Sequence, residues 1–308
     1  MSAQSSAPPR RRRLWRITAA FAVLLGLAVY LVVQYVTGGP GAPRCTVQAD
    51  GGAQPYELTP EQAANAATIA AVGSARELPE RAVTIALATA MQESQLRNID
   101  FGDRDSVGLF QQRPSQDWGT VKQIMDPVYS AGEFYTHLVK VRGYTELPLT
   151  EAAQRVQRSA FPRAYAQHEG NATQLAGALT GRAGAAMSCT QSRPVDGRSG
   201  GGTRVREKLV REFGNGVLPH GKAAGGDERT VRVPATAKDS GKGEGSRHGW
   251  EVAMWAMAHS AELHIEQISY AGQTWRAADS GKGWVRQEAS GDAAPGQSSD
   301  DVRIIAGQ

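Results

Sequence analysis

Cysteine is scarce in this chain, which has only two among its 308 residues. Neither Cys45 nor Cys189 belongs to a Cys-x-x-Cys pair or lies beside clustered histidines. Structural zinc sites and thiol redox centres need such clusters, so the sequence favours neither. We therefore expect no metal and no cofactor.

Acidic residues are missing from the first 40 positions, where five arginines supply the excess of positive charge. The rest of the chain carries 29 basic and 30 acidic side chains. Proteins that bind nucleic acid usually have a basic face on the folded domain itself. The charge distribution therefore argues against a nucleic-acid partner.

No charge interrupts residues 17–36, a predominantly apolar run of 20 residues. A helix of that length rises about 30 Å, enough to cross the hydrocarbon core of a bilayer. Arg10–Arg13 come just before it, so the positive-inside rule places the N-terminus in the cytoplasm. We predict a single-pass protein of the cell membrane, with residues 1–16 as a cytoplasmic tail and the later domains outside. A cleaved signal peptide is the alternative.

The two cysteines bracket residues 46–188 on the expected outer side, where disulfides persist. Closing a loop of that length is worth about 4–5 kcal/mol in the chain-entropy model. We predict one Cys45–Cys189 bridge that joins the two ends of a domain. Two free thiols, or a bridge between chains, are the alternatives.

Composition and helix signals divide the chain after the membrane segment, and the expected fold class is mainly α. Thr59-Pro60-Glu61-Gln62 combines a capping box with a proline in the first turn, and Asp126-Pro127 begins another helix. Low apolar content and repeated glycines indicate a linker. The predicted parts are an exposed stalk at 37–56, a compact lysozyme-like α-helical domain at 57–189, a flexible linker at 190–245 and a small α+β domain at 246–308.

Glu93 ends a strongly apolar helix, in the sequence Ala-Thr-Ala-Met-Gln-Glu-Ser of residues 88–94. Burial against apolar walls raises the pKa of a carboxyl group, as a general acid near neutral pH requires. For an arbitrary glutamate, a solvated helix end is the ordinary interpretation. The residues that follow Glu93 favour a chemical role instead.

At this point the chain resembles the lysozyme-like lytic transglycosylase (SLT) superfamily. That family shows a Glu-Ser pair at a helix end, a Gly-Leu-Met-Gln-type turn, a helix introduced by Asp-Pro and a tyrosine-bearing segment. The resemblance covers about residues 57–178. The matching positions are Glu93-Ser94, Gly108-Leu109-Phe110-Gln111, Asp126-Pro127 and Tyr165.

The resemblance implies cleavage of peptidoglycan glycan strands. Glu93 would protonate the oxygen between N-acetylmuramic acid and N-acetylglucosamine and then act as a base. Ser94 would support Glu93 or a sugar acetamide, and Gly108 would leave room for the glycan. Phe110 and Trp118 would stack on sugar faces, with core packing as an equal alternative. The implied substrate-binding set is Ser94, Gly108, Leu109, Phe110, Gln111 and Tyr165. Residues 156–162 depart from the family, because many members have Asn-Ala-Gly there.

Two products remain open. Attack by the sugar's own C6 hydroxyl gives a 1,6-anhydro product, whereas attack by water is lysozyme-like hydrolysis. Hydrolysis by two carboxylates needs a second acid, which Asp100, Asp103 or Asp105 would supply. A solvated turn with local ion pairs is the other interpretation of these aspartates. The loop lacks the ligand spacing of an EF-hand, which argues against calcium.

Residues 249–284 resemble the C-terminal module of some secreted actinobacterial proteins related to metal-dependent D-Ala-D-Ala peptidases. Asp301 and Arg303 stand where that module has histidines. Without imidazoles a zinc site is not built, so the resemblance implies a degenerate, non-catalytic copy. A small core around the tryptophans of this region is the favoured alternative.

Three functions are therefore hypotheses. The leading one is a membrane-anchored, outward-facing enzyme that cleaves peptidoglycan, its expected partner. The second is a non-enzymatic wall-binding or scaffold protein that kept a lysozyme-like fold, which the divergence at 156–162 favours. The third is a wall-opening component of an envelope-spanning conjugation or secretion machine, whose proteins would be further partners.

Overall fold

The computed structural model describes most of the chain beyond residue 42 and a short stretch before it. The described residues are 19–21, 23–30, 42–48, 54–158, 164–191, 201–219, 228–235, 246–286 and 301–307. The chain divides into two compact units, Met1–Ala42 and Pro43–Gln308.

In the first unit, residues 19–21 and 23–30 are helical. Among the described residues, no helix is both long enough and apolar enough to cross a membrane. The membrane-spanning helix of the expected fold class is therefore not found there. The basic tail at 1–16 and residues 17, 18, 22 and 31–36 of the expected span lie outside the described residues.

The second unit combines helices with two antiparallel sheets, so the expectation of a mainly α fold is wrong. A three-stranded sheet has the order β2-β1-β3, and a five-stranded sheet has the order β4-β8-β5-β6-β7. The strands are β1 (Arg44–Val47), β2 (Tyr56–Leu58), β3 (Met187–Thr190), β4 (Thr230–Pro234), β5 (Ile265–Tyr270), β6 (Gln273–Arg276), β7 (Val285–Arg286) and β8 (Asp301–Ala306). Strands of three or four residues, such as β1 to β3, are too short for an alternating pattern to reveal them.

Six α-helices lie between β2 and β3 in the described part of the chain. They are α2 (Pro60–Ala75), α3 (Glu80–Ser94), α4 (Val121–Ile124), α5 (Pro127–Leu138), α6 (Leu149–Gln157) and α7 (Glu169–Leu179). The start signals act as the sequence predicts. Thr59 accepts from the Gln62 amide in a complete capping box, and Asp126 accepts from the Val128 amide at the start of α5.

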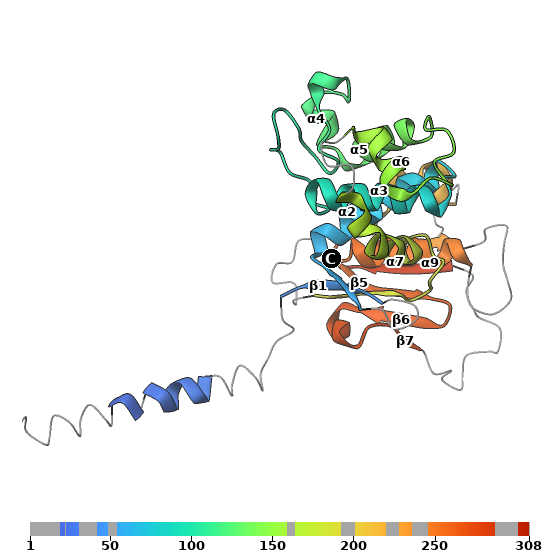
Figure 1. The fold of residues 1–308 in the computed structure, drawn as a ribbon. Coiled ribbons are helices and arrows are strands. Elements are labelled where there is room, and N and C mark those ends of the chain that lie inside the picture. Colours follow the sequence, from blue (N-terminus) through green and yellow to red (C-terminus); the bar gives the residue numbers. More distant parts are fainter. Residues whose placement is uncertain are drawn as a thin grey trace, which may run out of the picture. The chain divides into compact units, whose positions relative to one another are not determined.

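An α-helix and a strand form within residues 190–245, the stretch in which the sequence indicates a linker. Helix α8 (Gly201–Phe213) precedes strand β4, which pairs antiparallel with β8 in the five-stranded sheet. Helix α9 (Arg247–Ala258) follows and packs against β5, α2 and α7. In Figure 1, α7 and α9 lie between the labelled helices α2 to α6 and the labelled strands. The C-terminal elements thus pack directly on the helical region.

The predicted disulfide is confirmed. Cys45 on β1 and Cys189 on β3 face each other in register and are bonded, although they are 144 positions apart in the sequence. Both side chains are buried. The bridge therefore joins the two ends of the helical region, because β1 precedes α2 and β3 follows α7.

Candidate active site around Glu93

Glu93 is the penultimate residue of α3, a helix whose residues from Ala82 to Met91 are all buried. The helix ends there because Gln95 and Leu96 take left-handed backbone conformations, with φ of 56° and 60°. The side chain of Glu93 is itself partly buried. The chain thus places one carboxyl group at the edge of an apolar core.

A neutral side chain donates a hydrogen bond to this carboxylate. The hydroxyl of Tyr165, on the short 3₁₀ helix η3 (Ala164–His168), lies 2.7 Å from Oε1 of Glu93. The side-chain amide of Gln157, the last residue of α6, donates to the carbonyl oxygen of Phe110 at 2.8 Å. Burial raises the pKa of Glu93 above its usual value, and the Tyr165 and Gln157 side chains oppose that rise without cancelling it.

Ser94 links the end of α3 to the turn at residues 108–111. Its hydroxyl lies 2.7 Å from the carbonyl oxygen of Leu109 and 3.1 Å from that of Ala90. The side chain is buried, with 4% of its surface exposed. Ser94 therefore fixes the turn beside the acid and directs no hydrogen bond to Glu93 in the described contacts.

The turn depends on a glycine. Gly108 has a φ of +79°, and a Cβ there would lie 2.8 Å from the carbonyl oxygen of Ile124. Both the conformation and the close approach exclude a larger side chain without strain. The amide of Gln111 turns back within the same loop and donates to the carbonyls of Phe101 and Gly108 at 3.3 Å each.

The apolar residues of the turn belong to the core. Leu109 and Phe110 are fully buried, and the Phe110 ring stacks on Phe134 with centroids 4.7 Å apart. Trp118 stacks on His137 at 4.2 Å. The ring of Phe110, which the sequence predicts to stack on a sugar, therefore stacks on a core residue instead.

Asp100, Asp103 and Asp105 lie in the loop between Glu93 and Gly108. None of them makes a described contact with Glu93 that would provide a second acid beside it. Asp105 pairs with Arg113 at 2.8 Å and accepts from the amide of Ser115 at 2.8 Å. The Arg113 guanidinium and Ser115 hold the pKa of Asp105 well below its usual range. Asp100 and Asp103 are exposed. Among the described residues, no group of three His, Cys, Asp or Glu side chains could hold a metal ion.

Gln157 is the functional candidate that the sequence did not reveal. It lies within the segment at 156–162 that departs from the family pattern, and residues 159–162 of that segment lie outside the described residues. A lone glutamine at a helix end has no distinctive spacing. Only the packing of α6 against α3 brings its side chain near enough to lower the pKa of Glu93.

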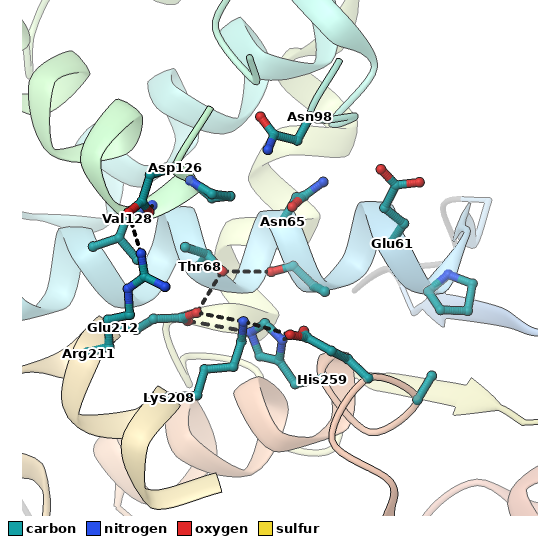
Figure 2. Close-up of a pocket in the computed structure, with 15 residues that line it drawn as sticks. Glu61, Asn65, Thr68, Asn98, Asp126, Val128, Lys208, Arg211, Glu212 and His259 are labelled. Carbon is teal, nitrogen blue, oxygen red and sulfur yellow. Dashed lines mark hydrogen bonds and ion pairs between the residues drawn. The ribbon is translucent and has the colours of Figure 1, made fainter. Parts of the chain in front are cut away.

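A second polar cluster occupies a cleft of about 530 Å³ between α2, α8 and the end of α9. Figure 2 shows Glu212 among the residues that line it, with Lys208 and His259 beside it. Glu212 is 2% exposed and accepts from Thr68 at 3.0 Å and from Trp255 at 2.6 Å. His259 is fully buried. We name Lys208, Glu212, His259 and Glu262 the Glu212 cluster.

Every charge of the Glu212 cluster has a partner of opposite sign. The ring of His259 lies 3.4 Å from Glu212 and 3.0 Å from Glu262, and Lys208 contacts both glutamates. Because Thr68 is on α2 and Glu212 is on α8, the cluster joins the C-terminal elements to the helical region.

One comparison with known proteins gives a match. The family model described as VldE, C-terminal domain, matches residues 231–296. That range begins in β4 and contains α9 and β5 to β7, so it lies outside the region around Glu93. A search of curated proteins finds no match to the chain.

Proposed function

We propose that this protein cleaves peptidoglycan glycan strands, with Glu93 as general acid and then general base. The observation that supports the proposal is the Glu93 carboxyl group at the end of α3. It is partly buried, receives a 2.7 Å hydrogen bond from Tyr165 and has a raised pKa. A raised pKa keeps a fraction of the group protonated near neutral pH, where it can donate to a leaving oxygen.

The proton moves twice in the proposed reaction. Glu93 first gives its proton to the glycosidic oxygen as the bond to the anomeric carbon breaks. The resulting carboxylate then removes the proton from the C6 hydroxyl of the same sugar, whose oxygen bonds to the anomeric carbon. The product is a 1,6-anhydro sugar, and Glu93 ends the cycle protonated.

The state of Asp105 supports this route over hydrolysis. Glycosidases that use a pair of carboxylates hold them roughly 5–9.5 Å apart across the scissile bond. Asp105 is engaged by Arg113 and Ser115, and its pKa is lowered, as in a structural ion pair. A single-carboxylate mechanism that uses the sugar's own hydroxyl needs no such partner.

The disulfide supports a location outside the cytoplasm. Bridges such as Cys45–Cys189 persist in oxidising compartments and are rare in the cytosol. Peptidoglycan lies in such a compartment, so the proposed substrate and the redox state of the chain agree.

The test compares the full chain, with its disulfide formed, against Glu93→Gln on purified peptidoglycan, with released muropeptides identified by mass spectrometry. Glu133→Gln, at a partly buried glutamate on α5, is the matched control. We expect anhydromuropeptides from the unchanged chain and from Glu133→Gln, and none from a folded Glu93→Gln. Reducing-end products would instead show hydrolysis and direct attention to Asp100, Asp103 and Asp105. Activity retained in Glu93→Gln contradicts the mechanism.

A non-catalytic wall-binding protein is the second candidate. The observation that favours it is Gln111, because its amide donates within its own loop. Sedimentation of the full chain with peptidoglycan, without release of any muropeptide, would support this candidate over the enzyme.

A further inference from the structure

The five-stranded sheet has one covered face and one open face. Helix α9 packs on β4, β5 and β8, and Figure 1 shows the labelled helices on one side of the labelled strands. Val231, Ile304 and Ile268 lie side by side on β4, β8 and β5 and are buried, as expected beneath α9. Successive residues of a strand point to opposite faces. The exposed side chains of Arg232 and Arg303 therefore lie on the open face.

These two arginines oppose each other across neighbouring strands. Arg232 on β4 and Arg303 on β8 are directly paired in the antiparallel ladder. Neither makes an ion pair among the described contacts. Like charges directly opposite each other destabilise a sheet. The folded chain thus carries a local repulsion at this point, which a bound anion would relieve.

The positive charge extends across the same face to the edge strand β7. The ladder continues from Arg303 through Ser269 and Thr274 to Val285. Thr274 and Val285 also line a cleft of about 200 Å³. We name the cationic face the five basic residues that the ladder and the cleft bring together, which are Arg232, Arg276, Lys282, Arg286 and Arg303.

The acidic residues near the cationic face do not neutralise it. Asp279 pairs with Lys282 at 3.3 Å, and Glu266 at the start of β5 pairs with Arg229 at 3.9 Å. Asp301, on the same face of β8 as Arg303, is half-buried. The described residues of the face therefore carry an excess of positive charge.

We propose that the cationic face binds a linear phosphodiester polymer of the cell wall. The N–H fork of a guanidinium matches two oxygens of a phosphate group. Neighbouring strands lie about 4.8 Å apart, so Arg232 and Arg303 are close enough to share one phosphate. A polymer with a charge in every repeat would continue across the strands to the cleft at β7.

A lipid surface suits this face less well. Val285 is the one large apolar side chain of its described residues that is mostly exposed to solvent. Binding at a bilayer interface draws on buried apolar area as well as on charge, and the face offers little such area. The inference adds a partner to the proposed glycan cleavage, and it rests on that proposal only for the location outside the cytoplasm.

The experiment measures binding of the full chain, with its disulfide formed, to fluorescently labelled poly(glycerol phosphate). The test variant combines Arg232→Gln with Arg303→Gln. Arg142→Gln, at an exposed arginine between α5 and α6, is the matched control. At about 50 mM salt we expect about tenfold weaker binding by the double variant and unchanged binding by the control. The slope of log affinity against log salt should fall by about two in the double variant.

Thermal unfolding without polymer gives a second readout. Because the two arginines repel each other, Arg303→Gln should raise the Tm by about 1–2 °C while it weakens binding. A structural role for Arg303 would lower the Tm instead. Unchanged binding in the folded double variant overturns the proposal.

Competing anions test the choice of partner. Phosphatidylglycerol vesicles and single-stranded DNA of random sequence are measured with the same variants. Tighter binding of either one, with the same dependence on Arg232 and Arg303, would make the proposed polymer wrong. Polymer binding by a chain that cleaves no peptidoglycan would retain this inference and reject the enzymatic function, whereas cleavage without polymer binding would do the reverse.

Discussion

The hydroxyl of Tyr165 lies 2.7 Å from Oε1 of Glu93. The two residues are 72 positions apart in the sequence, and η3 and α3 bring them together. Tyr165 is fully buried, whereas Glu93 is partly exposed. Tyr165 therefore donates to the Glu93 carboxylate from the core, and the carboxylate remains partly exposed to solvent.

Tyr165→Phe should keep the packing of the ring and remove the donor. Because that donor favours the charged form of Glu93, we expect the pKa of Glu93 to rise further. The high-pH limb of the pH profile for glycan cleavage should move upward by the same amount. The measurement is the pH dependence of kcat on peptidoglycan.

Tyr135→Phe is the control for loss of a buried hydroxyl. Tyr135 is fully buried, and its hydroxyl donates to the carbonyl of Ile69 at 3.0 Å, away from Glu93. Its loss should lower the free energy of unfolding by about 1 kcal/mol and leave the pH profile in place. Identical profiles for the two variants would mean that Tyr165 acts only through packing.

The sequence predicts the helical region well because its signals are local. Thr59 and Asp126 cap their helices through contacts with residues two or three positions away, and such contacts can be identified in a single sequence. The same locality explains what was missed. Strand β3 pairs with β1 and strand β4 pairs with β8, in each case across a long stretch of the chain, so neither β3 nor β4 has a partner nearby in the sequence to reveal it.

The candidate site was predictable only in part for the same reason. Glu93 and Ser94 lie in a recognisable order at a helix end, and the helix does end there. The sequence could not show that Phe110 would stack on Phe134, or that Asp105 would pair with Arg113. Each of these contacts depends on how loops and helices pack, and Gln157 was missed on that ground.

Gly108→Ala tests the geometry of the turn. A non-glycine residue at positive φ is destabilised by about 1–2 kcal/mol, and here a Cβ would also approach the Ile124 carbonyl to 2.8 Å. Gly143→Ala is a matched control, because Gly143 has a φ of +69° and no atom within 4 Å of the position of a Cβ.

Chemical denaturation measures both glycine variants. We expect the free energy of unfolding of Gly143→Ala to fall only by the conformational cost of a positive φ. The free energy of unfolding of Gly108→Ala should fall further, and this variant should also cleave glycan more slowly. Equal losses in the two variants would show that the turn yields around an added methyl group.

Removing the disulfide should destabilise the second unit. In the chain-entropy model a bridge between positions 144 apart restricts the unfolded chain strongly, and losing a native bridge typically lowers stability by about 2–5 kcal/mol. The change is Cys45→Ala with Cys189→Ala, measured by thermal unfolding of the full chain with and without reductant. Reductant should lower the Tm of the unchanged chain and leave that of the double variant as it was. No effect of reductant on either protein would refute the expectation.

The Glu212 cluster predicts how stability depends on pH. Burial lowers the pKa of His259, but Glu212 and Glu262 outweigh it, so the pKa is raised above 6.5. Burial raises the pKa of both glutamates, but His259 and Lys208 outweigh it, and the pKa of Glu262 falls to about 2. The raised pKa of His259 stabilises the fold fully below about pH 6.5, and this stabilisation is lost as the pH rises through the pKa of the folded state. The lowered pKa values of the two glutamates stabilise the fold above about pH 4.5, and this stabilisation is lost as the pH falls through their folded-state pKa values.

The full chain should therefore have its highest Tm between about pH 4.5 and 6.5, with a decline on the alkaline side that depends on His259. His259→Gln leaves buried Glu212 without its imidazolium, so it should lower the Tm overall and flatten that alkaline decline. His168→Gln is the control, because burial lowers the pKa of His168 and its loss should leave the decline in place. Thermal unfolding across pH 4 to 9 measures all three proteins. An alkaline decline of unchanged slope in His259→Gln would show that His259 does not join α8 and α9 to α2 through its charge.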